Sequence, residues 1–212
     1  MKIIEIKDEF YPKNLLNVYN PPKKLYVLGD EKILNEFSIA IVGSRTPSKY
    51  GENIAKSLAY NLAKHNVSVI SGMAKGIDSF AHIGCIFGRG KTIAVLGGGF
   101  NHIYPKENVK LLNDIIGSGG AIVTEYEENA RPLPQNFPKR NRIIAGLSSG
   151  VVVVEAKERS GSLITADLAL DQGKEVFAVP GNITSKLSKG TNELIKEGAK
   201  IVTNVFDILE EF

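Results

Sequence analysis

Four cations and one aromatic residue gather in residues 131–142, Arg-Pro-Leu-Pro-Gln-Asn-Phe-Pro-Lys-Arg-Asn-Arg, a stretch without acidic residues. Its prolines favour an extended loop, and its cations crowd the start of a helix that we predict over residues 140–147. The positive end of a helix dipole disfavours cations, so an anion bound there would relieve the repulsion. Nucleobases stack on aromatic rings while cations neutralise the backbone, so this segment predicts contact with single-stranded nucleic acid through Phe137, Lys139, Arg140 and Arg142. The alternative is a structural role, with Phe137 in the core and Arg140 and Arg142 in salt bridges.

Two glycine–serine segments add hydrogen-bond donors. Ser44 and Arg45 follow Gly43, and a hydroxyl beside a guanidinium on a flexible backbone suits a phosphate. In residues 160–162, Ser-Gly-Ser, one serine can cap a helix while the backbone amides point at an anion. Turn formation and capping alone are the alternative for both segments. Lys186 lies in a further loop, which is either solvated or the rim of a basic groove.

The familiar catalytic, metal and cofactor motifs are incomplete. Residues 97–102, Gly-Gly-Gly-Phe-Asn-His, lack the third glycine of a dinucleotide fingerprint and the acidic residue that should follow it. Residues 88–92, Gly-Arg-Gly-Lys-Thr, lead into a predicted strand, whereas a phosphate-binding loop leads into a helix. The three histidines have no metal-ligand spacing, Cys85 is the single cysteine, and the sequence has no Gly-x-Ser-x-Gly elbow. We therefore expect no catalytic residue, no metal and no cofactor.

Apolar, β-branched runs alternate with helical patterns along the chain. Short runs without polar alternation are typical of strands buried on both faces of a parallel sheet. We predict strands over 39–42, 67–70, 92–96, 121–124, 151–154, 175–179 and 200–202. Helices are predicted around 54–62 and over 77–87, 106–116, 140–147, 163–171, 193–196 and 205–212. This alternation predicts a doubly wound α/β fold with a mostly parallel sheet.

Glycine is enriched where the predicted strands end. The chain has 21 glycines in 212 residues, and Gly43, Gly72, Gly97 and Gly181 all follow strands. Ligands of doubly wound folds bind at this carboxyl edge, where glycine lets the backbone approach a phosphate. Tight strand-to-helix turns also need glycine, which explains part of the pattern. The rest predicts a binding crevice along one edge of the sheet.

The formal charge of +3, from 26 basic and 23 acidic residues, conceals an uneven distribution. The four cations of residues 131–142 give +4, whereas Glu125, Glu127 and Glu128 give −3 just before them. No apolar run approaches the ~18 residues of a membrane helix, and the first residues make no secretory signal. The lone cysteine favours a reducing compartment. We expect a cytoplasmic protein with one domain, or one domain and a short appendage.

In this order, the segments resemble the central domain of the DNA-processing protein A (DprA/Smf) family. The motifs that carry the resemblance include Ile-Val-Gly-Ser-Arg at 41–45, Ser-Gly-Met-Ala-Lys-Gly-Ile-Asp at 71–78, Phe-Pro-Lys-Arg-Asn-Arg-Ile-Ile at 137–144 and Ser-Gly-Ser-Leu-Ile-Thr-Ala at 160–166. The resemblance covers nearly the whole chain. It implies an extended Rossmann-like domain that binds single-stranded DNA, protects incoming strands during natural transformation and helps to load the RecA recombinase.

The resemblance also implies roles for particular residues. DNA contacts would come from Arg45, Lys106 and residues 137–142, including Asn141, and phosphate donors from Ser160, Gly161 and Ser162. The family forms dimers, and the segment with Asn192, Leu194 and Ile195 resembles part of the dimer contact. Core packing explains one of the two apolar residues equally well. Asn136 stands where a histidine is usual, and Lys139 where a small residue is common. Lys139 would strengthen the attraction of phosphates.

We expect two parts in the chain. Residues 1–35 would form an N-terminal extension packed on the main domain, and residues 36–212 a Rossmann-like DNA-binding domain. Many family members carry an additional helical domain before this region and a winged-helix-like domain after it, and we expect neither within this chain.

An enzyme that acts on a nucleotide monomer is the alternative function. Nucleoside-monophosphate phosphoribohydrolases also place a glutamate and a glycine loop at the strand edge, so Glu155 would act on the ribose and residues 160–162 would hold the phosphate. The chain lacks the Pro-Gly-Gly-x-Gly-Thr loop of those enzymes. An interaction scaffold is a third interpretation. Salt-dependent binding of oligo-dT, weakened by Arg45→Ala or Lys139→Ala, is expected only of the DNA-binding protein.

Overall fold

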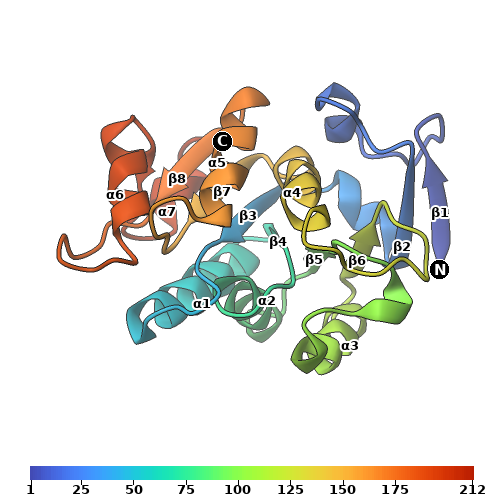
Figure 1. The fold of residues 1–212 in the computed structure, drawn as a ribbon, viewed down its shortest axis with the longest axis horizontal. Coiled ribbons are helices and arrows are strands. Elements are labelled where there is room, and N and C mark those ends of the chain that lie inside the picture. Colours follow the sequence, from blue (N-terminus) through green and yellow to red (C-terminus); the bar gives the residue numbers. More distant parts are fainter.

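A single nine-stranded sheet runs through the molecule, which a computed structural model describes over all 212 residues (Figure 1). Its order is β1-β2-β6-β5-β4-β3-β7-β8-β9, and all neighbours from β6 to β9 are parallel. The strands are β1 (Lys2–Glu5), β2 (Lys24–Gly29), β3 (Ser38–Val42), β4 (Ser68–Ser71), β5 (Thr92–Val95), β6 (Ala121–Thr124), β7 (Gly150–Val153), β8 (Glu175–Ala178) and β9 (Lys200–Ile201). All seven predicted strands form, and the doubly wound, mostly parallel α/β fold is confirmed.

Helices cover both faces of the sheet because the central strands carry apolar side chains on both sides. On β3, Ile39 and Ile41 pack in the cluster formed with α1 (Lys49–Lys64), α2 (Ile77–Phe87) and α7 (Phe206–Leu209). Ala40 and Val42 belong to the opposite cluster, with α4 (Asn136–Leu147), α5 (Gly161–Asp171) and α6 (Lys189–Lys196). Helix α3 (Val109–Gly117) packs on β5 and β6 next to α2. None of these helices has the length and apolar character needed to cross a membrane.

Helix α4 begins at Asn136, four residues before the predicted start at Arg140. Pro138 falls in its first turn, where a backbone N–H has no partner within the helix, so the proline does not interrupt it. The side-chain amide of Asn136 donates to the carbonyl of Gly97 at 3.0 Å and ties the helix start to the end of β5. Phe137 therefore lies on the first helical turn, and the expectation of an extended loop through this residue was wrong.

Residues 1–35 add two strands that were not among those predicted. Strand β2 pairs antiparallel with β6, from Tyr26 opposite Thr124 to Gly29 opposite Ala121. Strand β1 pairs antiparallel with β2 and forms the edge. Leu25 of β2 is fully buried in the same core cluster as α4 and α5. These first residues thus lengthen the sheet itself.

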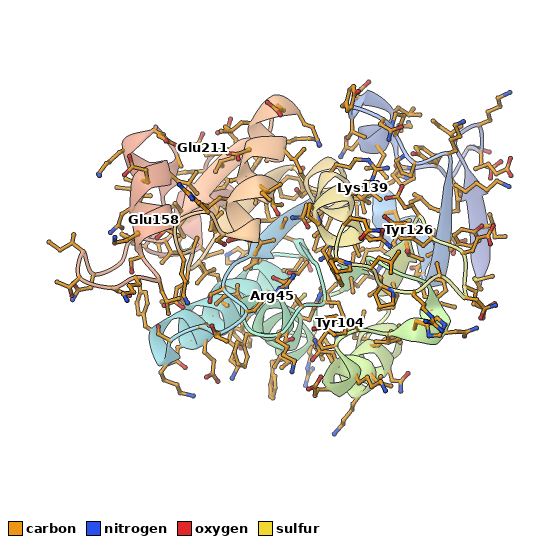
Figure 2. The ribbon with its side chains drawn as sticks, viewed as in Figure 1. Arg45, Tyr104, Tyr126, Lys139, Glu158 and Glu211 are labelled. Carbon is orange, nitrogen blue, oxygen red and sulfur yellow. The ribbon has the colours of Figure 1, made fainter.

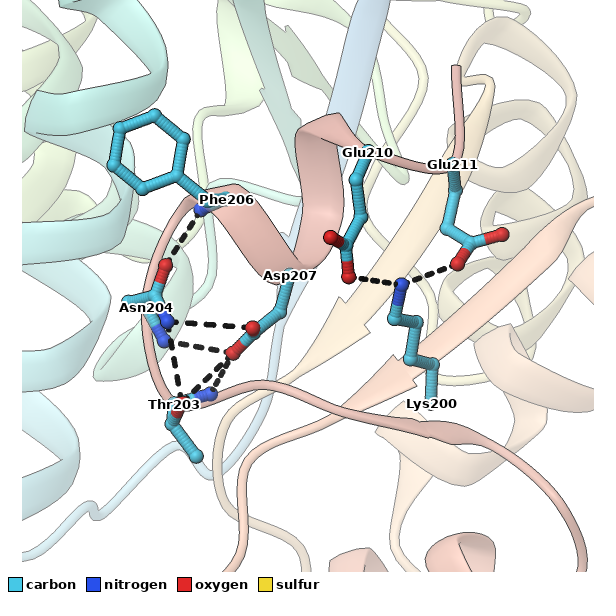
Figure 3. Close-up of polar contacts among 7 residues, drawn as sticks. All are labelled: Lys200, Thr203, Asn204, Phe206, Asp207, Glu210 and Glu211. Carbon is cyan, nitrogen blue, oxygen red and sulfur yellow. Dashed lines mark hydrogen bonds and ion pairs between the residues drawn. The ribbon is translucent and has the colours of Figure 1, made fainter.

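The C-terminal residues fold back on the other edge strand (Figure 3). The carboxylate of Asp207 accepts hydrogen bonds from the backbone amides of Thr203 and Asn204 at 2.6 and 3.0 Å, and these bonds lower the pKa of Asp207. Lys200 of β9 pairs with Glu210 at 2.6 Å and with Glu211. Helix α7 runs from Phe206 to Leu209 and ends three residues before the predicted end.

Candidate nucleic-acid interface

The strand order reverses between the neighbouring parallel strands β3 and β7. Strand β3 leads into α1 on one face of the sheet, and β7 leads into α5 on the other. Such a switch point opens a crevice at the carboxyl edge of a doubly wound sheet. A pocket of about 790 Å³ lies there, lined by the loops after β3 and β7 and by the first turns of α4 and α5. Two helix N-termini therefore favour an anion in this pocket.

The loop after β3 is held by the segments that follow β7 and β4. The backbone amide of Ser44 donates to the carbonyl of Glu155 at 2.8 Å, and the amide of Ile77 donates to the carbonyl of Ser44 at 3.1 Å. Gly76 permits this contact, because its φ is +79° and a Cβ there would lie 2.3 Å from the Ser44 carbonyl oxygen. The Ser44 hydroxyl oxygen accepts from the amide of Thr46 at 3.2 Å. Together these bonds fix the backbone on either side of Arg45.

Arg45, labelled in Figure 2, lies over the ring of Phe137 in the pocket lining. Its guanidinium carbon is 5.6 Å from the centre of the Phe137 ring. The Tyr104 ring lies 5.8 Å from that of Phe137, tilted by 56°. A Cβ at Gly97 would lie 3.0 Å from a ring carbon of Phe137, so the glycine gives this ring its place. Arg45 makes no ion pair within the protein, and its charge is free for a ligand.

Helix α5 starts at the pocket, and Ser160 is its N-cap, as predicted for one of the two serines. The Ser160 hydroxyl oxygen accepts from the amide of Ser162 at 3.2 Å and lies 2.5 Å from the Ser162 hydroxyl. Gly161 faces open space where a Cβ would project. Asn141 of α4 donates its side-chain amide to the Gly161 carbonyl at 3.2 Å and joins the two helix starts. This corner of the pocket leaves room for a phosphate close to the backbone.

Two buried charges, Arg140 and Asp78, lie at the floor of the pocket and are 4% and 6% exposed. The guanidinium of Arg140 donates to the carbonyl of Gly72, just after β4, and to that of Val95, the last residue of β5. The carboxylate of Asp78 accepts from the amides of Gly72 and Ala74 at 3.1 and 3.3 Å. Burial raises the pKa of Asp78 and lowers the pKa of Arg140 to about 10, and each opposite charge reduces the shift of the other. Arg140 therefore stays charged at neutral pH and holds the ends of two strands together.

Glu155 also has a structural position. Its carboxylate accepts hydrogen bonds from the backbone amide of Ser48 at 2.9 Å and from the Ser48 hydroxyl at 2.5 Å. Ser48 is the N-cap of α1, and the amide of Gly51 donates to its hydroxyl oxygen at 3.1 Å. A Cβ at Gly51 would lie 2.3 Å from a carboxylate oxygen of Glu155, so the glycine makes room for the acid. The glutamate fixes the start of α1, and this geometry does not favour the phosphoribohydrolase alternative.

A comparison with known families gives a match over almost the whole chain. The model of the family described as DNA recombination-mediator protein A matches residues 2–212. The chain belongs to this family. Protein Smf of Escherichia coli strain K12 is 47% identical over 208 residues, which are 98% of this chain and 56% of Smf. DNA processing protein DprA of Streptococcus pneumoniae is 46% identical over 207 residues, which are 98% of this chain and 73% of that protein.

Solved structures of family members share the fold. The X-ray structure of Streptococcus pneumoniae DprA matches with a TM-score of 0.94 and 44% identity, covering 100% of this chain and 74% of that one. A structure that concerns the single-stranded DNA binding mode of Helicobacter pylori DprA matches with a TM-score of 0.88 and 32% identity, covering 100% and 95%. A molybdenum cofactor binding protein from Rippkaea orientalis has a TM-score of 0.58 at 17% identity and shares the fold alone.

In this member of the DNA recombination-mediator family, the pocket brings together most of the predicted DNA contacts. Its lining includes Ser44, Arg45, Phe137, Asn141, Ser160, Gly161 and Ser162. Arg140 also lines the pocket, but its guanidinium is engaged with two backbone carbonyls. For Arg140 the structure favours the structural alternative that the sequence left open.

Other predicted contacts lie outside the pocket lining. Lys106, Lys139 and Lys186 are exposed. Arg142 is only 12% exposed, and its two terminal nitrogens each donate to the carboxylate of Glu125 at 2.7 Å. Its guanidinium is thus taken up by the segment after β6, and the salt-bridge alternative is favoured here as well.

Several lining residues were not among the predicted contacts, and Tyr104, Lys157 and Arg159 are three of them. Tyr104 stands in Ile-Tyr-Pro-Lys-Glu-Asn at 103–108, one of the segments that follow the carboxyl end of β5. Lys157 and Arg159 follow β7 and precede the capping serine of α5. Position after the carboxyl end of a parallel strand was the available signal for all three.

The predicted dimer residues have different environments. Leu194 is 4% exposed and belongs to the core cluster with α4 and α5, which is the core-packing alternative. The side-chain amide of Asn192 donates to the carbonyl of Gly181 at 3.0 Å and its oxygen accepts from the amide of Gly181 at 3.1 Å. Ile195 is partly buried near the end of α6. Of the three, Ile195 keeps the most apolar surface for a partner.

Proposed function

We propose that this protein binds single-stranded DNA in the pocket at the β3–β7 switch point. The observation that carries the proposal is Arg45, a cation without an ion pair, held beside two helix N-termini. Cations and helix N-termini both attract phosphate. The similarity to Helicobacter pylori DprA, whose solved structure concerns single-stranded DNA binding, supports the same ligand for this chain.

The lining suggests how a strand would lie. Arg45 would contact one backbone phosphate, and the open backbone of Gly161 with the Ser162 hydroxyl would contact another. Asn141 keeps these two sides in register through its bond to Gly161. Phosphates of the strand beyond the pocket would be attracted by three exposed lysines, Lys106, Lys139 and Lys186. This attraction would be weak, because salt screens exposed charges.

Fluorescence anisotropy with oligo-dT and with a duplex of the same length tests this proposal. We expect tighter binding of the single strand, with a logarithmic salt slope of about −0.7 for each phosphate neutralised. Arg45→Ala and Lys139→Ala should both weaken binding, the first more strongly because Arg45 lines the pocket. Binding of the parent that does not depend on salt, or two variants that bind like the parent, would refute the proposal.

We also propose that the bound strand is protected during natural transformation and passed to RecA in the cytoplasm. The chain spans 56% of the length of Escherichia coli Smf, so this activity is proposed for the whole protein. Nuclease protection of oligo-dT and the rate of RecA filament assembly should both increase with the parent protein. Arg45→Ala should lose both effects together if they depend on the pocket, and a variant that assembled RecA normally would contradict this.

A homodimer through the β9 edge is the last part of the proposal. Ile195 near the end of α6 and Ile201 on β9, which is 46% exposed, would supply the apolar contact. Sedimentation equilibrium should give a dimer for the parent and a monomer for Ile195→Asp. A parent that stayed monomeric at every concentration would remove this part and leave the DNA pocket unaffected.

A further inference from the structure

Helix α2 carries an apolar stripe that is only partly covered by the rest of the protein. Phe80, Ile83 and Phe87 are three and four residues apart, so they lie on one side of the helix. Phe87 is 77% exposed, and the other two are partly buried. None of the three lines the pocket at the switch point. A helical stripe of this kind usually packs against another element, and here its C-terminal end lies in water.

Helix α1 packs beside α2 on the same face of the sheet and widens this surface (Figure 1). The helices approach closely because two glycines of α2 face α1. A Cβ at Gly84 would lie 2.3 Å from the Lys56 carbonyl oxygen, and a Cβ at Gly88 would lie 2.8 Å from that of Tyr60. The Lys56 ammonium consequently reaches the Phe80 ring, 4.6 Å from its centre. Tyr60 is 40% exposed and adds a second aromatic ring beside the stripe.

The charges on these two helices are mostly positive. The ammonium of Lys64, at the end of α1, lies 5.3 Å from the centre of the Tyr60 ring. Neither Lys64 nor Arg89, an exposed residue just after α2, makes an ion pair within the chain. Glu52 is the only acid of the two helices that is not buried, and it already pairs with Lys56 at 2.7 Å. An anionic partner would therefore meet cations that no carboxylate of this chain neutralises.

We infer that this face docks an acidic amphipathic segment of another protein. The docking face, the α1–α2 surface, consists of Tyr60, Lys64, Phe80, Ile83, Phe87 and Arg89. Apolar side chains of the segment would cover the stripe, as in other complexes where an amphipathic helix binds an apolar face, and its carboxylates would pair with the free cations. The inference goes beyond the proposed function and does not depend on the DNA pocket.

Two other occupants fit this surface less well. A second copy of the chain would bring the same cations to a two-fold contact, where like charges repel. A DNA strand would have to stack its bases where lysines of α1 already lie over the Phe80 and Tyr60 rings. An acidic amphipathic segment meets neither obstacle, since it supplies the opposite charge and needs only an apolar contact.

Fluorescence anisotropy with a labelled synthetic peptide tests the inference. The probe is a peptide of about 15 residues, with Phe and Leu at helical spacing and Asp and Glu between them. Its control has the same composition in shuffled order, which removes the apolar stripe and keeps the charge. The parent should bind the ordered peptide at least tenfold more tightly than the shuffled one. Failure to bind the ordered peptide, or equal binding of both, would overturn the inference.

Variants then locate the binding site. Phe87→Ser should weaken binding of the ordered peptide by about 10-fold to 150-fold, the range for burying one aromatic side chain. Lys64→Gln should weaken it less and reduce its salt dependence, because one exposed ion pair is lost. Phe10→Ser is the matched control, since Phe10 is 55% exposed between β1 and β2. Equal effects of Phe87→Ser and Phe10→Ser would contradict the assignment of this surface.

Two further measurements on Phe87→Ser distinguish the other occupants. Binding of oligo-dT should equal that of the parent, because Phe87 lies outside the pocket. A loss of oligo-dT binding would assign the surface to nucleic acid and overturn the inference. Sedimentation equilibrium should give the same state of association for the parent and the variant. Self-association of the parent that Phe87→Ser abolished would assign the surface to a second copy instead.

Discussion

The guanidinium of Arg45 lies over the Phe137 ring, with 5.6 Å between the guanidinium carbon and the ring centre. This contact joins the loop after β3 to the first turn of α4 across the switch point of the sheet. It holds a long, flexible side chain near one position before any ligand arrives. Binding then loses less conformational entropy than it would with a freely moving arginine.

Arg45→Ala should weaken binding of single-stranded DNA about tenfold or more at low salt, since a charge-assisted contact contributes about 1.5–3 kcal/mol. The salt slope should fall in magnitude by about 0.7 because one phosphate contact is lost. Anisotropy titrations over a salt series measure both quantities. Arg89→Asn is the matched control: it removes the same charge from an exposed residue outside the pocket, whose φ of +62° asparagine tolerates. Equal losses in the two variants would show that net charge, not the pocket, determines binding.

Arg140→Met should destabilise the fold by about 3–5 kcal/mol, because it leaves the buried Asp78 without its compensating charge. Arg140→Lys should not restore stability, since one ammonium group cannot replace the planar guanidinium that reaches Gly72 and Val95. Urea denaturation measures the free energy of unfolding, and adding Asp78→Asn to Arg140→Met should recover part of the loss. A stable Arg140→Met variant that no longer bound DNA would instead identify Arg140 as a DNA contact.

Glu155→Gln should lower the free energy of unfolding by about 1–3 kcal/mol, since it replaces a buried carboxylate that accepts two hydrogen bonds from Ser48. The same variant should bind oligo-dT nearly as the parent does, because Glu155 is not part of the pocket lining. Incubation of the parent with AMP or CMP should release no free base. Base release by the parent that Glu155→Gln abolished would establish the phosphoribohydrolase alternative.

His82 should make stability depend on pH below neutrality. Burial, helped by the charge of Arg140, lowers the pKa of His82 to about 3. Its Nδ1 lies 2.7 Å from the Thr92 hydroxyl, which donates to the Val69 carbonyl at 2.7 Å, so Nδ1 carries the hydrogen. The buried Nε2 has no hydrogen-bond partner, which disfavours a second proton. In the unfolded chain the pKa of a histidine is about 6.5. Between these two values the unfolded state binds more protons, so the free energy of unfolding falls as pH decreases through this window.

The slope of the free energy of unfolding against pH that His82 causes should reach at most about 1.4 kcal/mol per pH unit and vanish above a pH of about 6.5. Urea denaturation at a series of pH values measures it. The His82→Leu variant should lose this part of the slope whatever its absolute stability, whereas His102→Gln, at an exposed histidine outside the core, should retain it. An unchanged slope in His82→Leu would mean that other groups cause the acid sensitivity.

The sequence alone predicted the seven parallel strands and the position of the binding edge. A buried parallel strand is a local feature, a short β-branched run that needs no polar face, and the carboxyl ends of such strands meet at one edge wherever they lie along the chain. Strands β1 and β2 were not predicted, although residues 25–28 of β2, Leu-Tyr-Val-Leu, are an apolar run as well. They form because β6, far along the chain, offers an edge for antiparallel pairing.

Only the tertiary structure decided which cations are free to meet a ligand. Arg140 and Arg142 are two residues apart in one basic segment, yet Arg140 reaches backbone carbonyls at or just after the ends of β4 and β5 and Arg142 pairs with Glu125. Arg45, from another segment, keeps its charge unpaired over Phe137, and Tyr104 joins it from a third. A guanidinium donates its hydrogen bonds to whichever acceptors the packed elements bring near it. Those acceptors come from distant parts of the chain, so residue type and spacing predicted where the pocket lies, and packing determined which of its cations remain unpaired.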